Sequence, residues 1–440
     1  MAEKNSALRT QHSALFRVLV LNSGSSSLKF RLFDIPQSIP SQSPNQKKLR
    51  ALHSDLSAQH SALSTVFSGS IAGIGGRASL HIAGHATVER DIHGYDEAAR
   101  WVFEQLDMVS IQAVGHRIVH GGERFSQPVR LTDAVIADLE QLNELAPLHN
   151  PPGLVVIRAS RALLTDQVPM VAVFDTAFHA VMPATGSTYA IPIELAARHH
   201  IRRYGFHGIA HAAMARSYAA ATGQSLEQVR LITLQLGNGC SAAAIRGGRS
   251  VDTSMGMTPL EGLVMGTRSG DIDPAVVAYL SRREGISAET VEQWLNERSG
   301  LRGVSGLTND VRDLLKAEQE GHHGAALALD LFCYRARKYI GSYLAVLNGA
   351  DAVIFGGGIG EHAPVIRERI CADMDWCGLR IDPQRNAAAS DPSTGQVLII
   401  SADSSPLPVY VVGVDEETVI AQETVSYLRA PERPAQSHLS

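Results

Sequence analysis

The ten residues LNSGSSSLKF (21–30) combine groups that could bind a phosphate within an apparent hairpin turn. The segment follows a largely apolar run at 16–20 and leads into alternating polar and apolar residues, which predicts strand, tight turn and strand. A hairpin turn needs little more than one Gly or Asn. Asn22, Gly24, three serines and Lys29 add hydroxyls, close backbone approach and a cation. The alternative is an ordinary Ser-rich hairpin loop. The spacing does not match GxxxxGK[ST], so the P-loop mode of phosphate binding is not expected here.

A second hairpin pattern follows in the other half of the chain. LITLQLGNGCSAAAI (231–245) again reads as apolar strand, Gly/Asn turn and apolar strand. If Gly24 aligns with Gly239, the two copies are 215 positions apart (239 minus 24), about half the chain. This spacing predicts two related halves that hold a phosphate chain between two glycine turns. Chance similarity between two hairpins is the alternative.

Four predicted strands end in residues that suit a ligand site, because α/β sheets bind ligands beyond the carboxyl ends of their strands. These ends carry an Arg, an Asp, a Gly cluster and a Glu, which together predict one cleft. The four are Ile111–Val114 before GHRIVHGG, Val171–Phe174 before Asp175-Thr176, Val353–Phe355 before GGGIGEH, and Val409–Val414 before Asp415-Glu416-Glu417.

Two further segments carry candidate chemistry. DTSMGMTPLEGLVMGTRSGDIDP (252–274) surrounds Arg268 with Gly, Thr, Ser and Met and lacks periodicity, which predicts a long ordered loop with short helical turns. His207 lies in RRYGFHG before a helix, where a lone His is more often a packed structural residue. His207 and His211 are four apart, but no HExxH glutamate or third ligand accompanies them, so zinc is not expected.

Composition restricts the class of protein. The 440 residues are 45% hydrophobic and 19% charged with a net charge of −5, which predicts neither nucleic acid nor a membrane as partner. No apolar run approaches a bilayer span, no signal peptide is convincing, and four cysteines read as reduced thiols of a cytoplasmic protein. Residues 36–66 read as a polar, partly disordered insertion.

The motifs together closely resemble the acetate kinase family, in the expected order and over about residues 16–430. They are LNSGSSSLKF, GHRIVHGG, FDTAFH, YGFHG, LGNG, DTSMGMTPLEGLVMGTRSGDIDP, FGGGIGEH and the late DEE. The resemblance implies the duplicated α/β two-domain fold of the sugar kinase, actin and heat-shock-chaperone ATPase superfamily, with nucleotide in the interdomain cleft. The expected division is an N-terminal-type domain of 16–179 plus 418–431, a nucleotide-binding domain of 180–417, and tails at 1–15 and 432–440.

The resemblance assigns roles residue by residue. It makes Arg117, Asp175, His207 and Arg268 catalytic, and Asn22 and Glu416 the metal-associated positions. The expected phosphate and nucleotide positions are Lys29, Gln235, Leu236, Gly237, Asn238, Gly239, Asp310, Val311, Arg312, Gly358, Ile359, Gly360, Glu361 and His362. The expected acyl-site positions are Arg117, Val119, Leu148, Phe206 and Pro259, the last four lining the methyl pocket.

The sequence departs from the family pattern at three positions. Gln235 stands where His is usual, so this position cannot become cationic, and some phosphate affinity is expected to be lost. His362 replaces the usual Asn and Met257 the usual Phe, which leaves nucleotide preference open.

The implied reaction is reversible transfer from MgATP (Mn²⁺ being possible) to the carboxylate of acetate, giving acetyl phosphate and ADP in a cytoplasmic homodimer. An ionised acid needs no general base, so direct in-line transfer is expected, with Asp175 orienting a neighbour. An acyl-phosphate enzyme at Asp175 is the alternative step. Alternative functions are a propionate or other short-chain acid kinase and a non-metabolic ATPase of the superfamily. A Rossmann dehydrogenase is disfavoured, because GGGIGEH does not fit GxGxxG.

Overall fold

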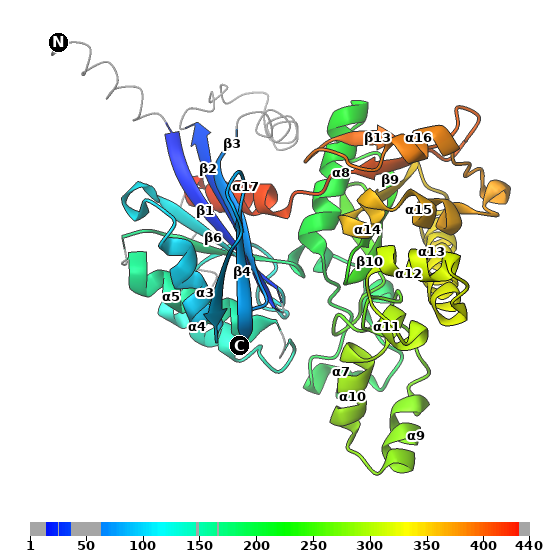
Figure 1. Cartoon of the computed structure of the whole chain (residues 1–440), viewed down its shortest axis with the longest axis horizontal. Helices are drawn as coiled ribbons and strands as arrows, with labels where there is room; N and C mark the ends of the chain where they lie inside the picture. Colours follow the sequence, from blue (N-terminus) through cyan, green and yellow to red (C-terminus); the bar gives the residue numbers. More distant parts are fainter. Residues whose placement is uncertain (1–14, 25, 37–62, 147–148, 165–166, 431–440) are drawn as a thin grey trace. The chain divides into compact units, whose positions relative to one another are not determined.

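The computed structural model describes residues 15–24, 26–36, 63–146, 149–164 and 167–430. The chain divides into two compact units (Figure 1). Unit 1 comprises residues up to Ala177 and from Glu416 onward, and unit 2 comprises Phe178–Asp415. The division expected from sequence lies at 179/180 and 417/418.

Unit 1 is built on a mixed sheet with the order β5-β4-β3-β2-β1-β6-β8-β7 in its described part. Its strands are β1 (Leu15–Ser23), β2 (Ser27–Pro36), β3 (Ser64–Ala72), β4 (Gly76–Ile82), β5 (Val88–Ile92), β6 (Ala113–Ile118), β7 (Val129–Arg130) and β8 (Met170–Phe174). The strands β1, β6 and β8 are parallel, and β2 pairs antiparallel with β1. The polar insertion predicted for 36–66 is too long at its end, because β3 begins at Ser64; residues 37–62 lie outside the described part.

Helices cover both faces of this sheet. They are α3 (Tyr95–Phe103), α4 (Asp133–Glu140), α5 (Asn150–Leu164) and α17 (Glu416–Arg429). Strand alternation places Gly115 and Arg117 on one face, and Gly115 lies against Ile420 and Thr424 of α17. A Cβ at Gly115 would meet Thr424 Oγ1 at 2.5 Å, so the helix can approach only a glycine here. Arg117 therefore shares the face that α17 covers.

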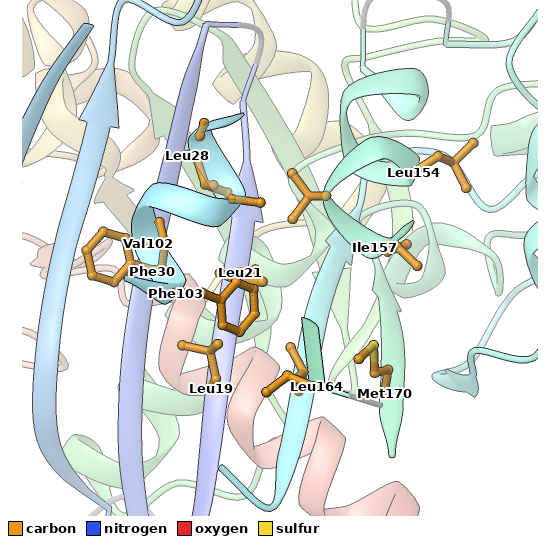
Figure 2. Packing of buried hydrophobic residues seen from close by; sticks show 14 of the residues in the cluster. Leu19, Leu21, Leu28, Phe30, Val102, Phe103, Leu154, Ile157, Leu164 and Met170 are labelled. Carbon is orange, nitrogen blue, oxygen red and sulfur yellow. The ribbon is translucent and has the colours of Figure 1, made fainter. Parts of the chain in front are cut away.

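The opposite face holds the hydrophobic core of unit 1 (Figure 2). Leu19 and Leu21 of β1 point toward α3 and α5, whose Phe103 and Ile157 lie in the same buried cluster. Each large apolar side chain contributes about 1.5–3 kcal/mol when it is fully buried. This core fixes the register of β1, because a slip of one residue would turn Leu19 and Leu21 to the other face.

Unit 2 has a second sheet with the order β11-β10-β9-β12-β14-β13. Its strands are β9 (Arg230–Leu236), β10 (Cys240–Arg246), β11 (Arg249–Thr253), β12 (Ala352–Gly356), β13 (Val397–Ile399) and β14 (Val409–Val412). Its helices are α6 (Ala184–Ser187), α7 (Ile193–Arg198), α8 (Gly208–Thr222), α9 (Ala275–Glu284), α10 (Ala288–Glu297), α11 (Gly300–Ser305), α12 (Val311–Gln319), α13 (His323–Leu347), α14 (Gly357–His362), α15 (Pro364–Cys371) and α16 (Pro383–Ala388). A short 3₁₀ helix covers Asp375–Cys377 of unit 2, another covers Met108–Ser110 of unit 1, and a third covers Ala177–His179, where the chain passes from unit 1 to unit 2.

The two sheets repeat one topology. In both, a hairpin (β1-β2 or β9-β10) is followed by two parallel strands (β6 and β8, or β12 and β14) and closed by an antiparallel edge strand. The helix α17 packs on the first hairpin sheet as α8 packs on the second. The duplicated α/β fold expected from the sequence is therefore confirmed.

The strand pairing corrects the alignment of the two hairpins. Ser23 pairs with Leu28 and Leu236 pairs with Cys240, so Gly24 and Gly237 each come first after the paired strand end. The two copies are 213 positions apart (237 minus 24). The alignment of Gly24 with Gly239 was wrong because the second turn is shorter. In the corrected alignment, Asn22 and Gln235 occupy equivalent strand positions.

No helix in the described ranges combines the length and the apolar composition that a bilayer span would need. The free cysteines are Cys240, Cys333, Cys371 and Cys377. The first three are buried, and Cys377 is partly exposed.

Candidate active-site residues in the two units

Asn22 at the end of β1 is the centre of a hydrogen-bonded cluster in unit 1. Its Nδ2 donates to Glu416 Oε2 at 3.1 Å and to Glu417 Oε1 at 3.0 Å, and its Oδ1 accepts from Arg117 Nη1 at 3.3 Å. Both amide protons are thus committed to the start of α17, which fixes the orientation of the amide. The Asn22 side-chain oxygen faces the guanidinium of Arg117 and keeps a second lone pair for a ligand.

Arg117 joins this cluster to the end of β8. Its Nη1 also donates to the Ser23 carbonyl at 3.3 Å, and its Nη2 donates to Asp175 Oδ2. Burial opposes the charged guanidinium, but the charges of Asp175 and Glu416 outweigh it, so the pKa of Arg117 is raised. Arg117 therefore stays cationic in a mostly buried position.

Two atoms of this ion pair have no partner among the described residues. They are Arg117 Nε and Asp175 Oδ1, and both are buried. A buried acceptor or donor is costly unless a water, ion or substrate satisfies it. The pair therefore presents one donor and one acceptor for a bound ligand.

The cluster around Asn22 fits a cation that receives most of its ligands from water and substrate. Within the described ranges, no group of three or more His, Cys, Asp or Glu residues could hold a metal by itself. Mg²⁺ is commonly held by one or two carboxylates together with waters and substrate phosphates. The Asn22 carbonyl, the carboxylate of Glu416 and the unpaired Asp175 Oδ1 supply oxygen atoms of the required kind.

His207 in unit 2 has an uncommon backbone conformation. It caps α8 with φ 57° and ψ 26°, in the left-handed region where non-glycine residues are rare. Its ring Nδ1 lies 2.8 Å from Ser241 Oγ of β10. This backbone and side-chain arrangement fixes where the ring can point, and strained positions of this kind concentrate at functional sites.

His207 and Arg268 approach the same point on the glycine turn of unit 2. A Cβ built on Gly239 would lie 3.3 Å from Arg268 Nη2 and 3.4 Å from His207 Nε2. Arg268 Nη1 donates to the Pro259 carbonyl at 2.7 Å, and no carboxylate in the described chain pairs with this arginine. Burial lowers the pKa of Arg268, because its charge is held without a counter-anion. A guanidinium, an imidazole and a turn backbone therefore converge where an anion would be stabilised.

The loop around Arg268 is held by polar anchors. After β11 it runs from 254 to 274 without a helix, and of the expected short turns the structure shows a hydrogen-bonded turn at 259–260. Arg203 Nη2 pairs with Glu261 at 2.6 Å, and its Nη1 donates to the backbone carbonyls of Thr253, Ser254 and Met255 at 3.1–3.2 Å. Glu261 also accepts from the Tyr189 hydroxyl. These contacts give an irregular segment a fixed conformation.

The predicted phosphate turn is held by the same loop. Gly266 N donates to the Asn238 carbonyl at 2.9 Å, and Asn238 Oδ1 accepts from Asn309 Nδ2 at 2.9 Å. Leu236 is fully buried, so its side chain packs in the core. Gln235 Oε1 is buried and has no partner among the described residues, which leaves an acceptor where the family usually carries His.

The segments expected to hold the nucleotide are the N-terminus of α12 and the short helix α14. Asp310 caps α12 through Arg312 N at 2.8 Å and pairs with the exposed Arg312 side chain; this hydrogen bond lowers the pKa of Asp310 to about 2. In α14, Glu361 Oε1 accepts from Gly357 N at 2.8 Å and from Val414 N at 3.2 Å. His362 is exposed and lies 2.9 Å from the Ser390 carbonyl. The Glu361 carboxylate therefore has a local structural role.

The residues expected around the acyl group are distributed over both units. Val119 and Phe206 are buried, Pro259 is partly exposed, and Leu148 lies outside the described residues. Val119 follows the end of β6 at Ile118, so strand alternation does not place its side chain on the face of Arg117. Lys29, the strand partner of Asn22, is exposed.

Of the four strand ends, the structure brings Arg117, Asp175 and Glu416 into one cluster within unit 1, while the Gly cluster forms α14 of unit 2. Arg117 itself lies inside β6 rather than beyond it. Sequence reasoning missed Glu417, although it stands beside Glu416 in the same motif. It also missed Ser241, whose hydroxyl contacts both His207 and His211 and which no motif singled out.

Comparison with known proteins identifies relatives along nearly the whole chain. The model of the Acetokinase family matches residues 17–422. A protein of Chloroherpeton thalassium named Acetate kinase is 43% identical, with 92% of this chain and 98% of that protein covered. One of Solibacter usitatus with the same name is 45% identical, with 95% and 100% covered.

Two solved structures agree with these matches. The crystal structure of Porphyromonas gingivalis acetate kinase is similar with a TM-score of 0.80 at 36% identity, covering 94% of this chain and 100% of that one. A propionate kinase from Francisella tularensis has a TM-score of 0.81 at 36% identity, covering 93% and 99%.

Proposed function

The chain belongs to the acetokinase family, and on this premise we propose that it reversibly transfers the γ-phosphoryl group of ATP to the carboxylate of acetate. The products are acetyl phosphate and ADP. The observation that carries the proposal is the pair of partly buried arginines: Arg117 is bound to Asp175 and Asn22, and Arg268 lies beside His207 at Gly239.

The acceptor explains why cations rather than a base are needed. A carboxylic acid with a pKa near 4–5 is already ionised at neutral pH. Its attack on a phosphoryl group is opposed mainly by charge repulsion. Arg117 and Arg268 reduce this repulsion, because planar guanidinium groups bind carboxylate and phosphoryl oxygens with paired hydrogen bonds. His207 donates to a phosphoryl oxygen through Nε2, so that catalysis proceeds by positioning and charge stabilisation.

Asp175 is a positioning residue in this proposal. One carboxylate oxygen is already engaged by Arg117, and attack on phosphorus by the other would remove charge from that buried pair. Direct in-line transfer to acetate avoids this cost. The carboxylate keeps Arg117 oriented and presents Oδ1 to a cation-bound water.

We propose Mg²⁺ as the divalent cation, with Mn²⁺ able to replace it. Asn22 Oδ1 and Glu416 would hold it, directly or through water, and Asp175 Oδ1 would accept from one of its waters. The cation supplies charge neutralisation of the nucleotide phosphates. The adenosine end of ATP is assigned to Asp310–Arg312 and Gly358–His362, as the family resemblance implies.

An acyl phosphate assay with hydroxylamine trapping tests the function. Purified protein with MgATP should form hydroxylamine-trappable acyl phosphate, best with acetate, measurably with propionate and poorly with butyrate, because one methylene supports discrimination of about 10–200-fold. ATP hydrolysis that ignores all three acids would contradict the proposal and favour a non-metabolic ATPase.

Propionate is the second candidate substrate. The propionate kinase neighbour matches this chain at the same identity, 36%, as the acetate kinase structure does. A higher kcat/KM for propionate would assign the chain to that activity.

The homodimeric state and cytoplasmic location are further proposals from the resemblance. Light scattering on the purified protein and fractionation of cells test them.

A further inference from the structure

A buried chain of hydroxyl and imidazole groups extends from His207 into unit 2. His207 Nδ1 lies 2.8 Å from Ser241 Oγ, and the same oxygen lies 2.8 Å from His211 Nε2. His211 Nδ1 lies 2.7 Å from Thr233 Oγ1. Thr233, Ser241 and His211 are each fully buried. Four groups are thus joined by three short hydrogen bonds.

The strand register explains how these groups meet. Thr233 and Gln235 lie on one face of β9, and Ser241 pairs with Gln235 in β10, so Ser241 faces the same way as Thr233. The helix α8 packs on this face, and its His211 lies one turn after His207. The chain of contacts is therefore a product of sheet register and helix period.

Ser241 makes the protonation of the two rings interdependent. Its hydroxyl has one proton, so it can donate to only one of the two imidazoles and must accept from the other. Burial and the neighbouring rings His179 and His207 lower the pKa of His211 well below its ordinary value, so His211 is neutral and has one N–H. Two arrangements remain, which run in opposite directions along the chain.

In the first arrangement, Thr233 donates to His211 Nδ1, His211 Nε2–H donates to Ser241, and Ser241 donates to His207 Nδ1. Neutral His207 then carries its proton on Nε2. In the second, every hydrogen bond is reversed, and neutral His207 carries its proton on Nδ1. Only the first arrangement gives a neutral His207 that can donate from Nε2.

Thr233 selects between them. In the reversed arrangement its hydroxyl accepts from His211 and its own proton needs another acceptor, but the Thr233 hydroxyl has no second hydrogen-bond partner among the described residues. A buried hydroxyl proton without an acceptor is unfavourable. We propose that Thr233, His211 and Ser241 form a polarity-setting chain that holds neutral His207 with its proton on Nε2, ready to donate to the transferring phosphoryl group.

Nε2 is the His207 nitrogen nearer the functional turn. It lies 3.4 Å from the position of a Cβ on Gly239, where Arg268 also approaches. The assignment of a phosphoryl oxygen as acceptor rests on the proposed function. The tautomer itself does not, so the two can fail independently. In this account Thr233 is a positioning residue that acts on the reaction through three hydrogen bonds.

Ring-nitrogen NMR tests the tautomer directly. Spectra of ¹⁵N-histidine-labelled full-length protein, recorded at a pH where the His207 ring is uncharged, should show both His207 and His211 as the Nε2–H tautomer. His179 provides an internal reference, because its Nε2 lies 3.0 Å from the Phe206 carbonyl, which only an N–H can satisfy. A wild-type His207 protonated on Nδ1 would overturn the proposal.

Thr233→Val removes the selecting hydroxyl at nearly constant volume. It should raise the Nδ1–H share of His207 and lower kcat by up to about tenfold, with KM for both substrates within about twofold. Thr233→Ser should restore both readouts. Ser250→Ala is the matched control, because it removes a buried hydroxyl 2.8 Å from His179 Nδ1 and should leave the His207 tautomer unchanged.

An unchanged His207 tautomer in folded Thr233→Val would overturn the proposal. If that variant does not fold, Ser241→Ala removes the link next to His207, and an unchanged His207 tautomer there would do the same. If no variant or wild type forms acyl phosphate, the proposed function fails, while the ring signals still decide the polarity of the chain.

Discussion

Asp175 binds the guanidinium of Arg117 through Oδ2 and leaves Oδ1 buried without a described partner. The Asp175 side chain is 1% exposed and that of Arg117 is 11% exposed, so solvent screens the pair weakly. The carboxylate thus has both a structural function and an unfilled hydrogen-bonding position.

Asp175→Asn should destabilise the protein and abolish most activity. The amide keeps the shape but removes the charge that compensates Arg117, and breaking a buried pair costs about 3–5 kcal/mol. The nearby charges of Glu416 and Glu417 reduce this cost, so the loss should fall at or below the lower end. Urea unfolding and kcat measure the two effects. Asp375→Asn, in the solvent-exposed pair with Arg380, should cost about 1 kcal/mol or less and spare kcat. Equal effects of the two variants would remove the special role of Asp175.

Gly239→Ala should reduce turnover without unfolding unit 2. The new methyl group would lie 3.3 Å from Arg268 Nη2 and 3.4 Å from His207, so both groups must move by a few tenths of an ångström. Small displacements of positioned groups lower kcat, by about tenfold here. Gly341→Ala, whose methyl group meets nothing within 4 Å, is the control and should leave kcat unchanged. A fully active Gly239→Ala enzyme would show that this point is not part of the site.

Glu416→Ala should raise the Mg²⁺ concentration needed for half-maximal activity. It removes the carboxylate from the proposed cation position, and with it the acceptor of one Asn22 amide N–H. A Mg²⁺ titration at saturating ATP measures the shift, with the fully exposed Glu289→Ala as control. If both variants give the wild-type titration curve, Glu416 has a structural role only.

Cys240 should resist alkylation although it adjoins the glycine turn. Burial raises the pKa of its thiol to about 12, and the thiol donates to the Gly237 carbonyl at 3.1 Å. The reactive species is the thiolate, which is scarce at pH 8 for such a group. Mass spectrometry after iodoacetamide treatment of the native enzyme should find Cys377, the partly exposed thiol, modified first. Preferential labelling of Cys240 would mean that this turn opens to solvent.

The sequence predicts the parts of this protein that depend on local pattern. The apolar runs at 16–20 and 231–236 identify β1 and β9, and the glycine turns identify both hairpins. The family motifs single out Arg117, Asp175, His207 and Arg268, but the identity of the residues that orient them depends on tertiary contacts.

Glu417 and Thr233 illustrate that limit. Each contacts its partner across a large sequence separation, Glu417 with Asn22 and Thr233 with His211, and only strand register and helix placement bring them together. The alignment of Gly24 failed for a related reason, because turn length is set by the strand pairing and the repeated sequence is too short to reveal it.

The fate of the acetate oxygens tests phosphoryl transfer to a carboxylate most directly. The enzyme is incubated with MgATP and acetate labelled with ¹⁸O in both carboxylate positions, and the product is observed by ³¹P NMR. If a carboxylate oxygen attacks phosphorus, every acetyl phosphate formed carries ¹⁸O in the bridge, and its ³¹P resonance is shifted from that of the unlabelled compound. An unshifted acetyl phosphate resonance, or release of inorganic phosphate without any acyl phosphate, would contradict the account.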